Sequence, residues 1–197
     1  MYSKIWLSKP HFETDDLDYF KTTMESNWIS TVGPNIASFE RSIEDVFNKN
    51  LKAVALNSGT SAIHLALKML HIGAGDEVIC QTFTFCATVN PILYCGATPI
   101  FIESEQETWN MCPTKLELAI NKYISQGRKP KAILLVHLYG MPYKVTEIRA
   151  IADKYAILSV IMSQDVDVIV VPSSYAIPSA FNPIPLGVVN KSFLINK

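Results

Sequence analysis

The chain lacks an excess of charge of either sign and has no cluster of basic residues. Its 17 Lys and Arg are nearly balanced by 18 Asp and Glu, which leaves a net charge of −1 over 197 residues. A protein whose main partner is nucleic acid usually presents a strongly basic surface. The composition therefore argues against nucleic acid and favours a small molecule as the partner.

Cysteine is scarce and shows no metal-binding spacing. The four cysteines are Cys80, Cys86, Cys95 and Cys112, with no C-x-x-C pair and no accompanying pair of histidines. This is neither the ligand pattern of a zinc site nor a disulfide framework. We expect reduced thiols in the core and no bound metal.

Long uninterrupted apolar segments are lacking as well. Residues 1–16, MYSKIWLSKPHFETDD, contain no apolar run of signal-peptide length. The last 42 residues carry only four charges, but Pro172, Pro178, Pro183 and Pro185 would interrupt a membrane-spanning helix there. We therefore expect a cytoplasmic protein without a membrane partner.

Short aliphatic or β-branched runs alternate with segments of helical periodicity from residue 53 to about residue 161. This alternation predicts an α/β fold of three layers, with a mostly parallel sheet flanked by helices. The strand-like runs are AVAL, EVIC, PIFI, KAILLV and AILSVI, and helices are expected up to Leu70 and near residues 86–95, 114–125 and 144–155.

Composition divides the chain into three parts. Residues 1–50 are predicted to form an extended arm and a helix near 36–48, and residues 51–161 the α/β unit. Residues 162–197 form a divergent apolar tail that contains prolines. Charge changes near the last boundary, because 31 of the first 155 residues are charged but only four of the final 42.

The first connection from strand to helix, NSGTS at residues 57–61, is the strongest candidate for a binding site. A strand that leads through small polar residues directly into a helix leaves free backbone N–H groups and the positive end of the helix dipole facing outward. Thr60 and Ser61 could add hydroxyl donors, so the loop predicts a phosphate site. The alternative is that Ser58 only caps the helix. The loop contains neither G-x-x-x-x-G-K-[ST] nor G-x-G-x-x-G, which counts against a nucleotide-binding Rossmann protein.

Three segments, in this order and spacing, resemble a known family. They are NSGTSAIHLAL, GAGDEVICQTFTFCATVNPILYCGATPIFIESEQETWNMCP and KAILLVHLYGMP, and the earlier NWISTVGPNIASFE fits the N-terminal arm of the same family. From about Lys4 to about Ile161 the chain is similar to the DegT/DnrJ/EryC1/StrS family of pyridoxal-phosphate-dependent sugar aminotransferases. The resemblance implies part of the large domain of the aspartate-aminotransferase fold (type I), with pyridoxal 5'-phosphate as cofactor.

The resemblance also implies cofactor-binding residues. Gly59, Thr60 and Ser61 match the turn that holds the cofactor phosphate, and Phe85 matches the aromatic residue that stacks on the pyridine ring. Without the family, Phe83 and Phe85 would be taken for core residues at the edge of a strand. His137 falls just past the carboxyl end of a strand, and we expect it to form a pocket wall rather than to act as a catalyst.

Residues of the N-terminal arm are implied to approach other molecules. Trp28, Thr31, Gly33 and Asn35 resemble the part of the arm that contacts the substrate or a neighbouring subunit. The implied substrate is a nucleotide-linked 3-keto or 4-keto sugar, and the implied amino donor is a compound such as glutamate. A stable member of this family is expected to be a homodimer with its site at the interface.

The chain departs from the family at the two groups that the chemistry needs. The family has an Asp at the end of the strand after the VHLYG helix, which keeps the pyridine nitrogen protonated, but this chain has Ser163 there. Asp165, two residues later and on the same side if the strand continues, is a candidate substitute. The family also has a lysine that bonds covalently to the cofactor. Lys191 is a candidate by distance along the chain, although the surrounding S-F-x-x-x-K motif is absent.

These departures lead to two expectations for the function. The chain is about half the usual length of the family and loses both motif and charge after about Ile157, so we expect a truncated or frameshifted aminotransferase that is inactive alone. The alternative is a non-catalytic remnant that binds pyridoxal phosphate, another phosphate-bearing ligand or a full-length paralogue.

Overall fold

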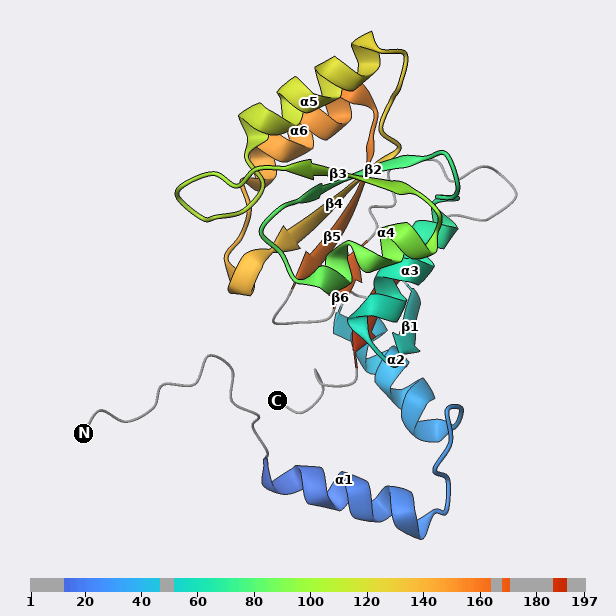
Figure 1. The fold of residues 1–197 in the computed structure, drawn as a ribbon. Helices are drawn as coiled ribbons and strands as arrows, with labels where there is room; N and C mark the ends of the chain where they lie inside the picture. The colour runs from blue at the N-terminus through green and yellow to red at the C-terminus, as the bar shows by residue number, and fades with distance from the viewer. Residues whose placement is uncertain (1–12, 47–51, 164–167, 171–185, 191–197) are drawn as a thin grey trace, which may run out of the picture.

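The computed structural model describes residues 13–46, 52–163, 168–170 and 186–190. They form a seven-stranded sheet in the order β1-β7-β6-β5-β4-β2-β3, with helices packed on both faces (Figure 1). Every neighbouring pair is parallel except the two that involve β6. The strands are β1 (Lys52–Leu56), β2 (Glu77–Gln81), β3 (Thr98–Ile102), β4 (Ala132–His137), β5 (Leu158–Ser163), β6 (Val168–Val170) and β7 (Leu186–Asn190). The prediction of a three-layer, mostly parallel α/β fold is confirmed.

The helices in the described residues mostly begin and end within two residues of the predicted positions. They are α1 (Thr14–Glu25), α2 (Pro34–Val46), α3 (Gly59–Met69), α4 (Asn90–Tyr94), α5 (Pro113–Ser125) and α6 (Val145–Tyr155), with short 3-10 turns η1 (Cys86–Thr88) and η2 (Leu138–Gly140). The single helix expected near residues 86–95 is wrong, because η1 and α4 divide that segment. Pro91 lies in the first turn of α4 and has no N–H with which to continue a helix from η1.

The extended arm expected at the start of the chain is wrong for residues 14–25, which form α1. A capping box begins this helix, since the Asp16 carboxylate accepts from the Glu13 N–H at 2.8 Å and the Glu13 side chain accepts in return. None of the α1 side chains is buried, and Figure 1 shows the helix standing apart from the sheet. Local capping, and not packing, therefore accounts for α1.

The sheet is buried on both faces. Successive side chains of a strand point to opposite faces, so Val78 and Cys80 of β2 pack in a core with α3 and α4, while Ile79 packs in a second core with α5 and α6. The same alternation holds in β4, where Leu134 belongs to the first core and Leu135 to the second. Burial on both faces explains why these strands are nearly continuous apolar runs in the sequence.

Helix α2 covers the outer edge of β1. The Ala53 N–H donates to Glu44 Oε1 at 3.2 Å, and the Ala55 N–H donates to Glu40 Oε1 at 2.9 Å. These are the N–H groups that an edge strand would otherwise offer to another chain. The two carboxylates therefore take the place of a neighbouring strand.

The expectation of four core thiols is confirmed in part. Cys80 and Cys95 are buried, Cys112 is half-buried and Cys86 is exposed, and all four are free. Cys86 is exposed because it begins the η1 turn outside the sheet. No helix in the described ranges has the length and apolarity to cross a membrane.

A pair of leucines on α5 tests how much the second core contributes to stability. Leu116 is fully buried and Leu118, two residues away, is 60% exposed. We predict that Leu116→Ala lowers the free energy of unfolding by about 2–5 kcal/mol, because it removes apolar contacts and leaves a cavity. Leu118→Ala is the control and should change it by less than about 0.5 kcal/mol. Urea denaturation of the two variants gives the comparison, and equal losses would contradict the core assignment.

Candidate functional site

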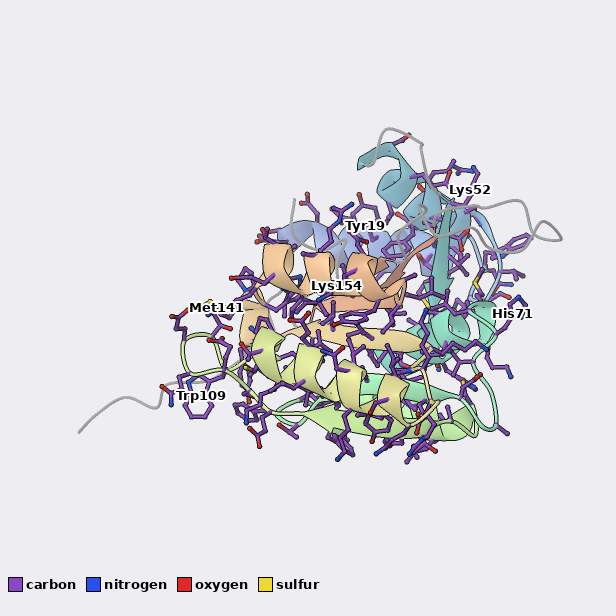
Figure 2. All side chains as sticks on the ribbon, turned by 90° about the horizontal axis from the view of Figure 1, so that it is seen from above. Tyr19, Lys52, His71, Trp109, Met141 and Lys154 are labelled. Atoms are coloured by element: carbon purple, nitrogen blue, oxygen red, sulfur yellow. The ribbon has the colours of Figure 1, made fainter. Side chains whose placement is uncertain are left out.

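The candidate site lies at the carboxyl ends of the parallel strands. The loops after β1, β2, β3 and β4 all leave the sheet at this edge, which is where ligands bind in open α/β sheets. Figure 2 shows Trp109 and Met141 near each other at this end and His71 at the opposite end. Loops that are far apart in the sequence are therefore neighbours here.

The loop after β1 presents unpaired donors at the beginning of α3. Ser58 is the N-cap, and its hydroxyl oxygen accepts from the Ser61 N–H at 3.2 Å. The first bond of the helical ladder runs from the Ala62 N–H to the Ser58 carbonyl, at 3.1 Å. The Gly59 and Thr60 N–H groups precede that bond and have no acceptor among the described residues. Ser58 is thus a cap, as the alternative held, and two donors remain for a ligand.

These donors suit a phosphate group. The positive end of an 11-residue helix lies behind them, and the half-buried hydroxyl of Thr60 lies beside them. The Ser61 hydroxyl is 3.0 Å from the Ser58 hydroxyl, so one of the two can donate to the other. The cradle contains no basic side chain in its own turn, so backbone dipoles would provide most of the attraction.

The loop after β2 carries two aromatic side chains that are outside the core. Phe85 is 67% exposed and Phe83 is 45% exposed, with the Phe83 ring edge-on to Trp109 at a centroid separation of 6.0 Å. The alternative interpretation of Phe83 and Phe85 as core residues is therefore wrong. An exposed Phe85 at this edge is free to contact a planar ligand, but its stacking role stays a prediction.

His137 is the last residue of β4 and is half-buried. Its ring stacks on Tyr143 with a centroid separation of 4.8 Å and an interplanar angle of 19°. Burial lowers the pKa of His137 below its usual value of 6.5, so the ring is neutral near pH 7. Its Nδ1 is buried without a hydrogen-bond partner in the described part of the chain. A neutral imidazole whose Nδ1 has no partner among the described residues agrees with a pocket wall more than with a proton carrier.

Ser163 lies beside His137 at the same edge. It is the last residue of β5 and the register partner of His137 in β4. The resemblance implies a carboxylate at the end of this strand, and the residue found there is Ser163. Asp165 and Lys191, the other two candidates, lie outside the described residues.

Trp28, Thr31 and Gly33 lie in the connection between α1 and α2, and Asn35 lies in the first turn of α2 (Figure 1). The Trp28 indole donates to the Val32 carbonyl at 2.7 Å and covers Gly33, where an added Cβ would be 2.0 Å from the indole nitrogen. Asn35 donates to the Thr23 hydroxyl at 2.8 Å, and Thr31 is exposed. These contacts build a local turn, and the predicted contact with a substrate or a second subunit stays a prediction.

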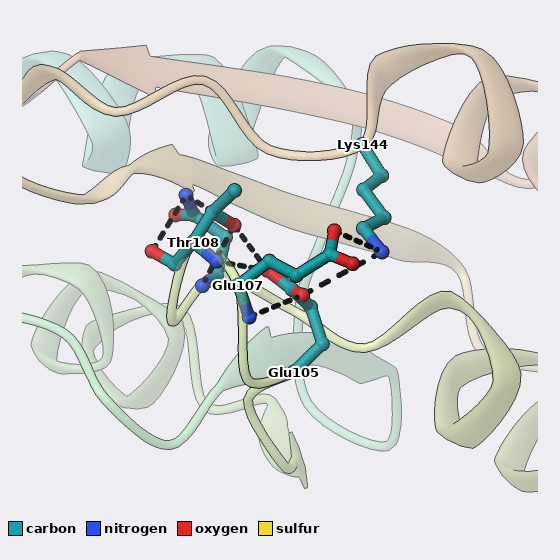
Figure 3. A network of polar contacts seen from close by, with 5 residues as sticks. Glu105, Glu107, Thr108 and Lys144 are labelled. Atoms are coloured by element: carbon teal, nitrogen blue, oxygen red, sulfur yellow. Dashed lines mark hydrogen bonds and ion pairs between the residues drawn. The ribbon is translucent and has the colours of Figure 1, made fainter.

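The loop between β3 and α5 holds a polar network that the sequence analysis missed (Figure 3). Glu105 accepts from the Glu107 N–H at 2.9 Å, from the Thr108 N–H at 2.7 Å and from the Thr108 hydroxyl. Lys144, beyond β4, pairs with Glu107 at 2.9 Å and with Glu105 at 3.6 Å. The polar run SEQET predicts a loop, but nothing in it indicates which side chain is held inside.

This network determines the ionisation of its members. The Thr108 hydroxyl, together with the Glu107 and Thr108 N–H groups, lowers the pKa of Glu105 to about 2 although burial acts in the opposite direction. The hydrogen bond with Glu107 raises the pKa of Lys144 above its usual value of 10.5. Both groups are therefore charged throughout the neutral range, and the link between the two loops persists there.

The fold and the edge define an open α/β protein with a phosphate-type cradle at the carboxyl ends of its strands. The family model that matches is the DegT/DnrJ/EryC1/StrS aminotransferase family, over residues 10–163, and the chain belongs to this family. Pyridoxal phosphate is the cofactor that this membership supports.

Three similar proteins show the sequence identity and the share of each chain that the similarity covers. EpsN of Bacillus subtilis strain 168, provisionally named a pyridoxal phosphate-dependent aminotransferase, is 46% identical over 157 residues, which are 80% of this chain and 40% of EpsN. GDP-perosamine synthase of Caulobacter vibrioides is 37% identical over 155 residues, 79% of this chain and 40% of the synthase. The PLP form of Spr1654 from Streptococcus pneumoniae, provisionally named a sugar aminotransferase, is 32% identical with a TM-score of 0.67, covering 77% of this chain and 37% of that one. The chain thus spans about 40% of the length of these relatives.

The Glu105 network gives a prediction for the dependence of stability on pH. Because the folded pKa of Glu105 is lowered from 4.5 to about 2, its carboxylate stabilises the fold above about pH 4.5 and loses this effect as the pH falls towards 2. We predict that Glu105→Gln lowers the free energy of unfolding at pH 7. The difference in this free energy between the variant and the parent should become smaller as the pH falls from 4.5 to 2.

Glu103 provides the matched control. It is 72% exposed and pairs only with Lys115 among the described residues, at 3.4 Å, so Glu103→Gln should have little effect at any pH. Urea denaturation at pH 7, 4 and 3 separates the two variants. If Glu105→Gln lowers the free energy of unfolding by the same amount at all three pH values, the assigned network is contradicted.

Proposed function

We propose that this chain is the N-terminal portion of the cofactor-binding domain of a sugar aminotransferase, and that the assembled enzyme acts on a nucleotide-linked keto sugar with an amino donor such as glutamate. The observation that carries the proposal is the pair of free N–H donors at the beginning of α3, within a chain that belongs to this family. The name of GDP-perosamine synthase supports a nucleotide sugar as the substrate class. Surface polysaccharide or glycan biosynthesis is the process that such amino sugars serve.

The chain's own residues divide the work of holding the cofactor. Gly59 and Thr60 would bind the phosphate through their N–H groups, and the Thr60 and Ser61 hydroxyls would complete the cradle. Phe85, which is exposed at this edge, would lie against one face of the ring, and His137, whose pKa is lowered by burial, would form a wall beside it. When bound, pyridoxal phosphate supplies the aldehyde that exchanges amino groups and a ring that withdraws electrons.

We propose further that residues 1–197 by themselves do not catalyse transamination. The supporting feature is Ser163 at the carboxyl end of β5, because a serine hydroxyl cannot keep a pyridine nitrogen protonated as a carboxylate does. The same feature supports the second candidate function, a non-catalytic protein that binds pyridoxal phosphate, another phosphate-bearing ligand or a full-length paralogue. Phosphate binding at α3 is common to both candidates.

The proposal includes a homodimer in the cytoplasm. Helix α1 has no buried residue and exposes large apolar side chains such as Tyr19 (labelled in Figure 2) and Phe20, which a neighbouring subunit would cover. Trp28, Thr31, Gly33 and Asn35 continue this arm towards the neighbouring subunit or the substrate. The four free cysteines agree with a reducing compartment.

A proline at position 59 tests the phosphate cradle without removing the helix. Proline fits the first position of a helix, where α2 and α5 already have Pro34 and Pro113, and the extended backbone of Ser58 suits a following proline. Gly59→Pro removes one donor to a charged phosphate, which is worth about 1.5–3 kcal/mol. We predict a Kd for pyridoxal phosphate that is roughly 10-fold to 100-fold higher.

Thr14→Pro is the matched control, since it places proline at the first position of α1, away from the cradle. It should leave the affinity unchanged. Absorbance titration with pyridoxal phosphate, with circular dichroism to verify folding, measures both variants. A folded Gly59→Pro protein with unchanged Kd, or a parent chain without measurable binding, would refute the cradle.

The absence of transamination is tested by chemical trapping. We predict that incubation of the chain with pyridoxal phosphate, followed by borohydride reduction and peptide mass spectrometry, gives no stoichiometric lysine adduct, because no lysine has the family's surrounding motif. Slow, scattered adducts on exposed lysines such as Lys129 are expected, because any surface amine reacts slowly with an aldehyde. Lys191→Ala should leave the adduct pattern of the other lysines unchanged. A stoichiometric adduct on Lys191 together with turnover of a keto-sugar nucleotide would show that the proposal is wrong.

A further inference from the structure

Two loops at the carboxyl edge are joined through one buried side chain. The loop after β3 contains Asn110, which is fully buried, and the loop after β4 contains Leu138, Tyr139 and Met141. The two loops are 28 to 31 residues apart in the sequence where they meet at Asn110. This contact belongs to no strand pairing or helix packing of the described fold.

Both polar atoms of the Asn110 amide group form hydrogen bonds with the loop after β4. Its Oδ1 accepts from the Leu138 N–H at 3.0 Å, and its Nδ2 donates to the Met141 carbonyl at 2.8 Å. The amide is itself held in place, because Nδ2 also lies 3.2 Å from the Thr108 hydroxyl oxygen. One planar group thus fastens the two ends of a four-residue segment.

The segment between these two attachment points has a backbone that L-residues rarely adopt. Tyr139 lies within it at φ 50° and ψ 36°, in the left-handed region, and its side chain is 59% exposed. Trp109, the residue before Asn110, also has a positive φ of 62°. Such conformations persist only where surrounding contacts determine them, and the Asn110 bonds to Leu138 and Met141 are contacts of this kind.

We propose that Asn110 is a positioning residue, which holds the segment from His137 to Met141 in the conformation that the cofactor edge requires. The inference rests on the proposed function for the use of this edge, but the geometry of the segment is independent of any ligand. Leu138 directly follows His137, so its fastened N–H limits how far the His137 ring can move from Tyr143. Asn110 touches neither His137 nor the Gly59–Ser61 cradle in any described contact, and it acts through the loop.

Asparagine provides both a hydrogen-bond acceptor and a donor at position 110, which neither alanine nor ionised aspartate does. The segment offers a buried N–H and a carbonyl, so a single side chain must accept at one end and donate at the other. Asn110→Ala leaves both backbone groups without their partner. Asn110→Asp keeps an acceptor for the Leu138 N–H but provides no donor for the Met141 carbonyl when it is ionised.

Residue-specific hydrogen exchange by NMR tests the proposal on the whole chain. In Asn110→Ala the Leu138 amide should exchange at least about 10-fold faster relative to the β4 amides of Ile133 and Leu135, since about 1.4 kcal/mol of lost protection corresponds to tenfold. In Asn110→Asp the Leu138 amide should stay protected. The matched control is Asn121→Ala on the outer face of α5, where Asn121 accepts from the Tyr155 hydroxyl at 2.9 Å, and it should leave Leu138 unchanged.

A second readout follows the His137 ring, which a merely stabilising residue would not affect. In Asn110→Ala the titration midpoint of His137, followed by its ring proton resonances, should rise towards 6.5 as the ring loses burial. The Kd for pyridoxal phosphate should rise several-fold in the same variant. If the parent chain binds no pyridoxal phosphate, the proposed function fails, while the exchange and titration data still decide the role of Asn110.

The pattern of exchange separates positioning from general stability. Faster exchange at Leu138 alone, with an upward shift of the His137 midpoint, supports the proposal. Unchanged exchange at Leu138, or an equal increase at Leu138, Ile133 and Leu135, overturns it. Where Asn110→Ala does not fold, Asn110→Asp decides, because an unprotected Leu138 amide beside protected β4 amides would overturn the proposal as well.

Discussion

Burial of the central parallel strands on both faces is the constraint on which the rest of the molecule depends. β2 and β4 have almost no exposed side chain, because α3 and α4 cover one face and α5 and α6 cover the other. β2, β3, β4 and β5 run parallel in this sheet, and parallel strands bring their carboxyl ends to one edge. The loops with Ser58, Phe85, Asn110 and His137 therefore meet at this edge as a consequence of how the core is filled.

At the carboxyl edge, the described residues offer hydrogen-bond donors for an anion at the beginning of α3 but a serine at the end of β5. The beginning of α3 provides a cradle for an anion from backbone groups alone, since Ser58 satisfies one donor and leaves the Gly59 and Thr60 N–H groups free in the described residues. At the end of β5, however, the group beside His137 is Ser163, which cannot carry a charge at neutral pH. Under the proposed function, anion binding and catalysis would be separable in this chain, because the first would need only local backbone geometry and the second would need a carboxylate and an amine from more distant segments.

Sequence patterns predicted the strands and helices that are marked by an apolar run or by a turn of small polar residues. Apolar runs such as KAILLV located β4, and the small polar residues after AVAL located the beginning of α3. They failed at α1, where a capping box between Glu13 and Asp16 forms a helix without a buried face, and at residues 86–95, where Pro91 divides the helix. They also missed Asn110, because a polar residue in a polar loop carries no periodic signal. Family membership, now supported over residues 10–163, was recognisable from three motifs in order.

The sequence by itself determined the α/β class, the approximate ends of the helices and strands, and the residues of the phosphate-type turn. These features depend on neighbours within a few positions along the chain, through side-chain periodicity, capping and turn geometry. Only the tertiary structure decided that Phe83 and Phe85 are outside the core, that His137 stacks on Tyr143, and that Asn110 joins two loops about 30 residues apart. Burial and hydrogen bonding between distant residues depend on the order of strands in the sheet, which no local pattern in the chain specifies.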